Sequence, residues 1–239
     1  MKFAYLIEPP FNFRSDDGEV TGCDVELARS ILADVDAGGF EPVETEFAQL
    51  LPGLAAGKWR MTTGLFATAE RRRVASFSRP IWALSDGLLV RKHNPKCLAG
   101  YLSIAGDNSV RLAVIRDQFQ HRSAVDFGVP DHRISIFESY AQAAEAVING
   151  AVDAYASVGR AHTGFVEQHP QAELDLVIVP REEKPPAFGS FAFAREDNQL
   201  RCAVDDALAV FLGSDKHRAM MARFGFSEGE VDLVANWTE

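Results

Sequence analysis

Short apolar runs alternate along the chain with longer stretches in which apolar residues recur every three to four positions. Runs of the first kind predict strands, and stretches of the second kind predict amphipathic helices. The first pair is a strand at residues 3–7 and a helix at 24–35, whose apolar face would consist of Val25, Leu27, Ala28, Ile31 and Leu32.

The same alternation continues to the end of the sequence. The first part should hold a strand at 42–46, a helix at 48–56 stopped by Gly57, and strands at 61–65 and 84–90. After His93-Asn94-Pro95 we expect a second unit, with strands at 111–115, 134–137, 151–156 and 174–179 and helices at 118–127, 139–149 and 159–168. Beyond a charged, proline-rich segment at 181–186 come a strand at 188–193 and helices at 198–212, 215–224 and 228–235. This order predicts two α/β units with largely parallel sheets, and such folds bind ligands in a cleft.

Composition narrows the functional classes. Of 239 residues, 47% are hydrophobic and 24% charged, and the net charge of −10 argues against nucleic-acid binding, which needs clustered Lys and Arg. No apolar run reaches the length of about 20 residues that spans a bilayer. Three Cys without CxxC spacing and six His without HxxxH spacing favour neither a disulfide scaffold nor a metal site, so we expect no metal and no cofactor.

Several stretches in fixed order carry a family pattern. They are Pro9-Pro10-Phe11-Asn12-Phe13, residues 18–28 (GEVTGCDVELA), 51–59 (LPGLAAGKW), Thr68-Ala69-Glu70-Arg71 followed by Phe77-Ser78, 149–154 (NGAVDA), 188–193 (FGSFAF) and 200–226. Taken together they resemble the bacterial extracellular solute-binding proteins of family 3, the receptors that deliver polar amino acids to ABC importers.

The resemblance implies a two-lobed, type II periplasmic-binding-protein-like α/β fold, with a mixed, mostly parallel sheet flanked by helices in each lobe. Lobe 1 would comprise 1–90 and 188–239, and lobe 2 would comprise 91–187. The expected function is capture of a small carboxylate-bearing solute, an amino acid or similar compound, in the interlobe cleft, without catalysis. The implied partner is a membrane permease, and the chain should be a monomer. Met1-Lys2 leads straight into a strand without a signal peptide, so a cytoplasmic protein stays an alternative to the implied periplasmic one.

The resemblance also implies a binding site in lobe 1. Arg71 lies where the family places an arginine that forks onto the ligand carboxylate, a task suited to a planar, permanently charged guanidinium. Gly64, Leu65 and Phe66 match the loop whose backbone meets the ligand head group. The family usually has Ser or Thr at position 66, so a core role for Phe66 is an equal alternative. A solvated turn is the alternative for Arg71.

In lobe 2, Gln118 and Phe119 match a helix start that closes over the ligand carboxylate, where free N–H groups favour an anion. Asp117 is expected to be an ordinary N-cap. Val158 stands where amino-acid binders usually have an acid that pairs with the ligand ammonium. Glu8 is the candidate replacement, with an exposed strand-end acid as the alternative.

Phe11, Phe47 and Trp82 are candidates for apolar walls of the site, although aromatic residues are more often part of the core. With Val158 and Phe66 in place of polar residues, the pattern favours a carboxylate whose amine is secondary, quaternary or absent.

Two other functions use the same fold. One is a cyclohexadienyl-dehydratase-like enzyme, with Glu8, His162 or Glu167 as general acid. The other is a ligand-sensing module.

Overall fold

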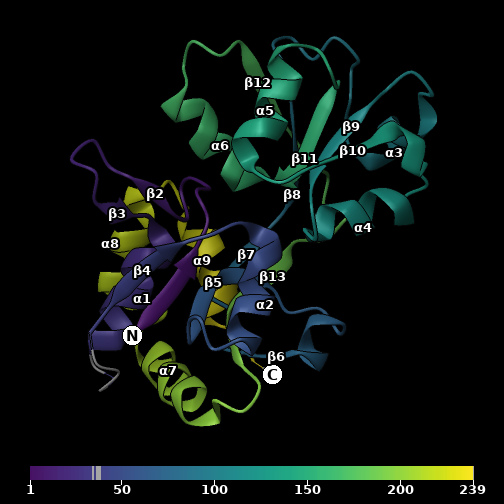
Figure 1. Ribbon diagram of the computed structural model, residues 1–239. Helices are drawn as coiled ribbons and strands as arrows, with labels where there is room; N and C mark the ends of the chain where they lie inside the picture. The colour runs from purple at the N-terminus through teal and green to yellow at the C-terminus, as the bar shows by residue number, and fades with distance from the viewer. Residues whose placement is uncertain (34, 36–38, 239) are drawn as a thin grey trace. The chain divides into compact units, whose positions relative to one another are not determined.

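The chain folds into two compact α/β units in a computed structural model that describes residues 1–33, 35 and 39–238 (Figure 1). Unit 1 consists of Met1–Ala83 and Ala187–Glu239, and unit 2 consists of Leu84–Pro186. The chain therefore leaves unit 1 once and returns to it once. Every helix in the described part of the chain is too short or too polar to cross a membrane.

Unit 1 is built on a six-stranded mixed sheet. Its strands are β1 (Lys2–Tyr5), β4 (Glu41–Glu44), β5 (Met61–Phe66), β6 (Ala75–Phe77), β7 (Trp82–Leu84) and β13 (Ala187–Ala194). The order is β4-β1-β5-β13-β6, with β7 beside β13. β1 runs parallel to β4 and β5, whereas β13 runs antiparallel to β5 and β6. β5 and β13 are central strands, and most of their residues are buried.

Helices and two short 3-10 turns complete unit 1. They are α1 (Cys23–Ala33), η1 (Phe47–Gln49), α2 (Leu50–Ala55), η2 (Arg71–Arg73), α7 (Asn198–Phe211), α8 (Asp215–Arg223) and α9 (Glu228–Ala235). A separate small ribbon pairs β2 (Phe13–Arg14) with β3 (Val20–Thr21). Ser214 and Ser227 start α8 and α9 by accepting hydrogen bonds from backbone N–H groups of the first turn, which stabilises both helix ends.

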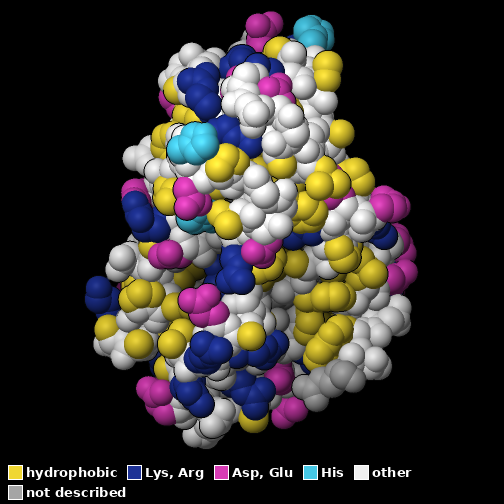
Figure 2. All heavy atoms as spheres, turned by 90° about the vertical axis from the view of Figure 1, so that its right-hand side faces the viewer, with side chains coloured by type: hydrophobic (Ala, Val, Ile, Leu, Met, Phe, Trp, Pro, Cys, Tyr) yellow, Lys and Arg dark blue, Asp and Glu magenta, His cyan; other side chains and the backbone are white. Residues whose placement is uncertain are grey.

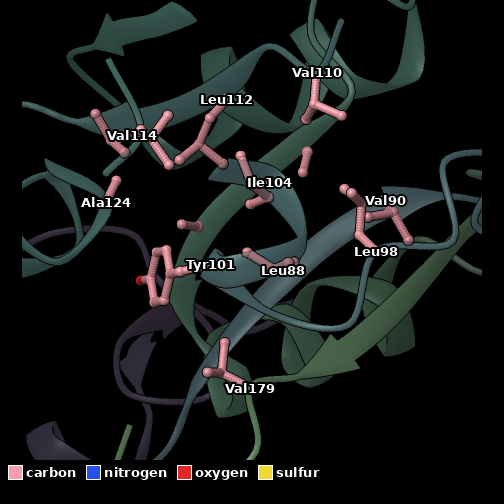
Figure 3. Packing of buried hydrophobic residues seen from close by; sticks show 13 residues of the cluster. Leu88, Val90, Leu98, Tyr101, Ile104, Val110, Leu112, Val114, Ala124 and Val179 are labelled. Atoms are coloured by element: carbon pink, nitrogen blue, oxygen red, sulfur yellow. The ribbon is translucent and has the colours of Figure 1, made fainter. Parts of the chain in front are cut away.

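Unit 2 has a five-stranded sheet of its own. Its strands are β8 (Asp86–Arg91), β9 (Leu112–Ile115), β10 (Ile134–Phe137), β11 (Ala154–Val158) and β12 (Leu174–Ile178), in the order β10-β9-β11-β8-β12. The flanking helices are α3 (Tyr101–Gly106), α4 (Phe119–Asp126), η3 (Asp131–Arg133), α5 (Tyr140–Ile148) and α6 (Gly159–Gln168). Figure 3 shows the apolar cluster that these elements bury, with Leu88, Leu112 and Ile104 inside and the Tyr101 hydroxyl at its edge.

Several elements differ from the sequence-based expectation, among them the short strands β2, β3, β6 and β7, which were not predicted. The strand expected in lobe 1 at 84–90 is β8, which pairs with β11 and β12 and so belongs to unit 2. β11 begins at Ala154, because residues 151–153 form the turn after α5. Helix α3 was not expected at all. The expected helix at 24–35 is α1, and its predicted residue Asp34 lies outside the described residues.

Candidate functional site

Arg71 opens the 3-10 turn η2 shortly after β5. Its guanidinium Nη1 donates to the Phe66 carbonyl at 3.0 Å and its Cζ lies 5.1 Å from the centre of the Phe47 ring. The backbone N–H of Arg71 is held by Thr68 Oγ1 at 3.2 Å. The carbonyl and the ring face orient the guanidinium, and they bring together three predicted residues, Arg71, Phe66 and Phe47.

The other two arginines of the run are exposed. Arg72 donates to the Ala67 carbonyl and lies over the Phe77 ring, and the Arg73 carbonyl accepts from Arg195. Figure 2 shows several Lys and Arg side chains gathered on one surface of unit 1. The difference in exposure separates Arg71 from its neighbours as the better candidate for a ligand contact.

Two of the three wall candidates, Phe11 and Trp82, form one group with Phe66, whereas the third, Phe47, lies at the Arg71 guanidinium. Trp82 lies with its ring centroid 5.5 Å from that of Phe11 and 5.6 Å from that of Phe66, and Phe11 also meets Phe226 edge-on. Phe11, Trp82 and Phe66 are buried, and Phe47 is partly buried. Phe66 therefore contacts both the aromatic group through its ring and Arg71 through its carbonyl.

Gly64 is part of β5 and faces the indole of Trp82. A Cβ added to Gly64 would stand 2.8 Å from the ring, and one added to Gly189 on β13 would stand 2.0 Å from it. The indole therefore lies against two strands at positions where only glycine leaves room. Leu65, the next residue, is 2% exposed and packs into the apolar core of unit 1, which is a structural role for its side chain.

A buried carboxylate that the sequence analysis did not single out connects these segments. Asp24 on α1 accepts hydrogen bonds from Thr63 Oγ1 at 2.6 Å, Gly64 N at 2.8 Å and Trp82 Nε1 at 3.1 Å. Asn12 Nδ2 donates in turn to Thr63 Oγ1 at 2.8 Å. Desolvation by burial raises the pKa of Asp24, and the donors around it act in the opposite direction. The sequence does contain a signal for this residue, because Asp24 is an acid within the largely apolar run at 20–28.

Glu8 follows the first strand and is 8% exposed, so the alternative of an exposed strand-end acid is wrong. Its backbone closes a turn with Asn12, in which Glu8 N donates to Asn12 O at 2.9 Å and Glu8 O accepts from Phe11 N at 3.0 Å. This turn brings the backbones of Glu8 and Phe11 within hydrogen-bonding distance.

Residues 117–119 of unit 2 form the start of α4. Gln118 is the N-cap and Phe119 the first helical residue, so the expectation that Asp117 is the N-cap is wrong. Asp117 instead has a φ of 62°, in the left-handed region that Asp tolerates better than most residues. Gln118 is buried, and Lys184 Nζ lies 5.0 Å from the centre of the Phe119 ring.

A second buried acid lies beside these residues. Asp86 Oδ2 accepts from Lys184 Nζ and from Tyr101 Oη, both at 2.6 Å, and Asp86 Oδ1 accepts from Gln120 Nε2 at 3.0 Å. Val158 is the register partner of Asp86 across the β8–β11 pair, and it also caps α6. The predicted unit 2 residues thus cluster around an ion pair that sequence reasoning missed, since its members are far apart in the chain.

Two of the three candidates for a general acid, His162 and Glu167, fit catalysis poorly. His162 is fully buried, with Nδ1 2.6 Å from Tyr140 Oη and Nε2 3.2 Å from the Gly87 carbonyl. Burial lowers the pKa of His162 to about 3, so the ring is neutral and has no proton to spare near pH 7. Glu167 is exposed on α6. Among the residues that the structure describes, no group of three His, Cys, Asp or Glu side chains is arranged to hold a metal ion.

The fold and these motifs agree with a comparison against protein families. The model of the bacterial extracellular solute-binding proteins, family 3, matches residues 2–228. The chain belongs to this family. The expected family and the type II periplasmic-binding-protein fold are both confirmed.

Two relatives and one solved structure illustrate the similarity. A probable amino-acid ABC transporter periplasmic-binding protein of Sinorhizobium fredii is 29% identical, over 98% of this chain and 80% of its own. The arginine-binding protein ArgT of Corynebacterium glutamicum is 27% identical, over 94% of this chain and 73% of its own. The crystal structure of EhuB in complex with hydroxyectoine superposes with a TM-score of 0.87 at 24% identity, covering 98% of this chain and 93% of the other.

Proposed function

We propose that this protein is the periplasmic receptor of an ABC importer and captures a small carboxylate-bearing solute, with Arg71 as the carboxylate-binding residue. Membership of the solute-binding family supports the receptor role, and the relatives named for amino-acid transport support the solute class. The observation that carries the assignment is the Arg71 guanidinium, held by the Phe66 carbonyl and the Phe47 ring. Such a pre-oriented fork binds a carboxylate with little loss of side-chain entropy.

Aromatic and acidic side chains define the rest of the proposed unit 1 contacts. Phe11, Phe66 and Trp82 supply apolar area, and Glu8 supplies the charge that would pair with a cationic group of the solute. Val158, which stands where amino-acid binders of the family usually have an acid, is apolar and buried. The solute class therefore depends on whether Glu8 takes over the role of the missing acid. Gln118, Phe119 and Val158 stay proposals for contacts from unit 2.

A calorimetric screen tests the function. The probes are L-arginine, L-histidine, L-glutamine, hydroxyectoine and 5-guanidinopentanoate, which is arginine without its α-amine. We expect at least one probe to bind, and Arg71→Ala to weaken that binding by a hundredfold or more, about 2.7 kcal/mol. Arg72→Ala is the matched control, since Arg72 is the exposed neighbour, and it should bind as the wild type does. Equal affinity of the Arg71→Ala and Arg72→Ala variants would refute the role of Arg71.

The pair of L-arginine and 5-guanidinopentanoate tests the solute class. Without a partner for the α-ammonium, the deaminated analogue should bind at least as tightly as the amino acid, because burial of an unpaired charge is costly. If L-arginine binds a hundredfold tighter, the ammonium has a partner, and Glu8→Gln should then remove most of that difference.

A further inference from the structure

The buried acid Asp24 lies behind the residues proposed to meet the solute. We infer that Asp24 is a positioning residue, which holds the Gly64 backbone and the Trp82 indole in the arrangement that binds the solute. This inference rests on the proposed function. The Asp24 network is defined as Asp24, three of its donors, which are Thr63, Gly64 and Trp82, and Asn12, which donates to Thr63. The neighbouring Cys23 Sγ also donates to Asp24 Oδ1, at 3.6 Å.

The first argument concerns the orientation of Trp82. Its indole lies against Gly64 and Gly189, where an added Cβ would come within 2.8 Å and 2.0 Å of ring atoms. Contact with two glycines of the same sheet packs the ring closely against β5 and β13, but it does not decide in which direction the N–H edge points. Nε1 donates to Asp24 Oδ1 at 3.1 Å, and a hydrogen bond to a carboxylate is directional and strong. Asp24 therefore sets the rotation of the ring, and with it the side that contacts Phe11 and Phe66.

The second argument concerns the β5 backbone. Gly64 N donates to Asp24 Oδ2 at 2.8 Å, two residues before Phe66, whose carbonyl orients the Arg71 guanidinium. Glycine has the widest conformational freedom of any residue, so this segment needs an external contact to keep one geometry. The carboxylate on α1 supplies that contact from outside the sheet.

The third argument concerns the Glu8–Asn12 turn. Asn12 is 1% exposed, and its Nδ2 donates to Thr63 Oγ1, whose own hydroxyl donates to Asp24 Oδ2 at 2.6 Å. The relay of two hydrogen bonds connects the turn that carries Glu8 and Phe11 with the same carboxylate. One acid thus links three segments that are distant in the chain and that all contain proposed solute contacts.

A purely structural acid would stabilise unit 1 without affecting binding beyond its effect on folding. The test is Asp24→Asn, which keeps the size of the side chain but replaces one acceptor oxygen by an NH₂ donor facing other donors. Asp205→Asn is the matched control. Asp205 is a partly buried acid of unit 1 that accepts from the backbone N–H of Arg79 at 2.7 Å and from Arg201 at 2.9 Å, away from the network.

Two readouts are combined. Calorimetry with the five probes named above gives the dissociation constants, and ¹H–¹⁵N NMR of the solute-free protein reports the Gly64 amide and the Trp82 indole. We expect Asp24→Asn to weaken binding by tenfold or more, while Asp205→Asn binds as the wild type does. We also expect the Gly64 and Trp82 N–H signals to move upfield in Asp24→Asn alone, since both lose a charged acceptor.

The outcomes separate this inference from the proposed function. If binding depends on Arg71 but Asp24→Asn and Asp205→Asn bind equally well, Asp24 is only structural and the inference is wrong. Unchanged Gly64 and Trp82 signals in Asp24→Asn overturn it as well, whether or not a probe binds. Binding that does not depend on Arg71 overturns the proposed function instead.

Asp24→Asn could fail to fold because the acid is fully buried, and Thr63→Val then takes its place. This nearly isosteric change removes the hydroxyl that joins Asn12 to Asp24, and it leaves the bonds from Gly64 and Trp82 intact. Positioning predicts a smaller but measurable loss of affinity, about threefold to tenfold, a range of about 0.7–1.4 kcal/mol. No loss of affinity in Thr63→Val would contradict the relay.

Discussion

Acid should destabilise unit 2 through His162. The ring is completely buried, and desolvation lowers its pKa from 6.5 to about 3 in the folded chain. Between these two pH values the unfolded chain binds a proton that the folded chain does not, so the free energy of unfolding falls as the pH decreases. Above pH 6.5 the burial of neutral His162 no longer lowers the free energy of unfolding. Each pH unit below that value removes about 1.4 kcal/mol, hence about 2 kcal/mol at pH 5.

The measurement is urea unfolding at pH 8, 6.5 and 5 for the wild type and His162→Gln. Far-UV circular dichroism is the suitable signal, because all three Trp residues lie in unit 1 and report little on unit 2. Glutamine can still accept from Tyr140 and donate to the Gly87 carbonyl, but it does not titrate. We expect the variant to be less stable than the wild type at pH 8 and to lose about 2 kcal/mol less between pH 8 and pH 5.

Two other histidines make the comparison specific. His217, whose pKa burial lowers to about 4, is present in both proteins, so its contribution cancels in the difference. His132→Gln changes an exposed histidine of the same unit and controls for the substitution itself. The reasoning is refuted if wild type and His162→Gln lose the same free energy between pH 8 and pH 5.

Two further experiments, one on packing and one on charge burial, use urea unfolding. Gly189→Ala places a Cβ 2.0 Å from the Trp82 ring and should lower the free energy of unfolding by about 1–3 kcal/mol. Gly229→Ala, which has open space inside α9, should raise it by about 0.5–1 kcal/mol. Equal effects of the two substitutions would contradict the close packing of Trp82 against Gly189. Lys184→Met removes the cation paired with the buried Asp86 and should cost about 3–5 kcal/mol, and a loss under about 1 kcal/mol would show that the remaining donors suffice.

Elements with their own apolar face were predictable from the sequence. Strand β9 and helices α5 and α6 lie close to their expected bounds, because their apolar periodicity matches the face that each buries. Helix α3 was not predictable in this way. Glu183 accepts from backbone N–H groups at its first turn, and the buried Arg133 guanidinium donates to carbonyls at its end, including Ile104 O at 2.9 Å. Both partners are distant in sequence, so local patterns carry no trace of them.

The residues of the candidate site were predictable or not for the same reason. Arg71 and its neighbours on β5 could be named because a local motif surrounds them. The contacts of Asp24 and Asp86 could not, since Asp24 is 58 residues from Trp82 and Asp86 is 98 residues from Lys184. An acid within an apolar run signals a buried partner, but the run does not say which residue that partner is.

The position of β13 in its sheet has a consequence for biosynthesis. β13 is formed from residues 187–194 and lies between β5 and β6, so unit 1 lacks a central strand until most of the chain has been translated. Unit 2 is one uninterrupted stretch that ends at Pro186. When the chain emerges from its N-terminus onward, the unit whose residues begin the chain is therefore the second to be completed, and the edges of β5 and β6 stay open while unit 2 folds. Open strand edges pair readily with other chains, so this interval is when a nascent chain most needs protection from aggregation.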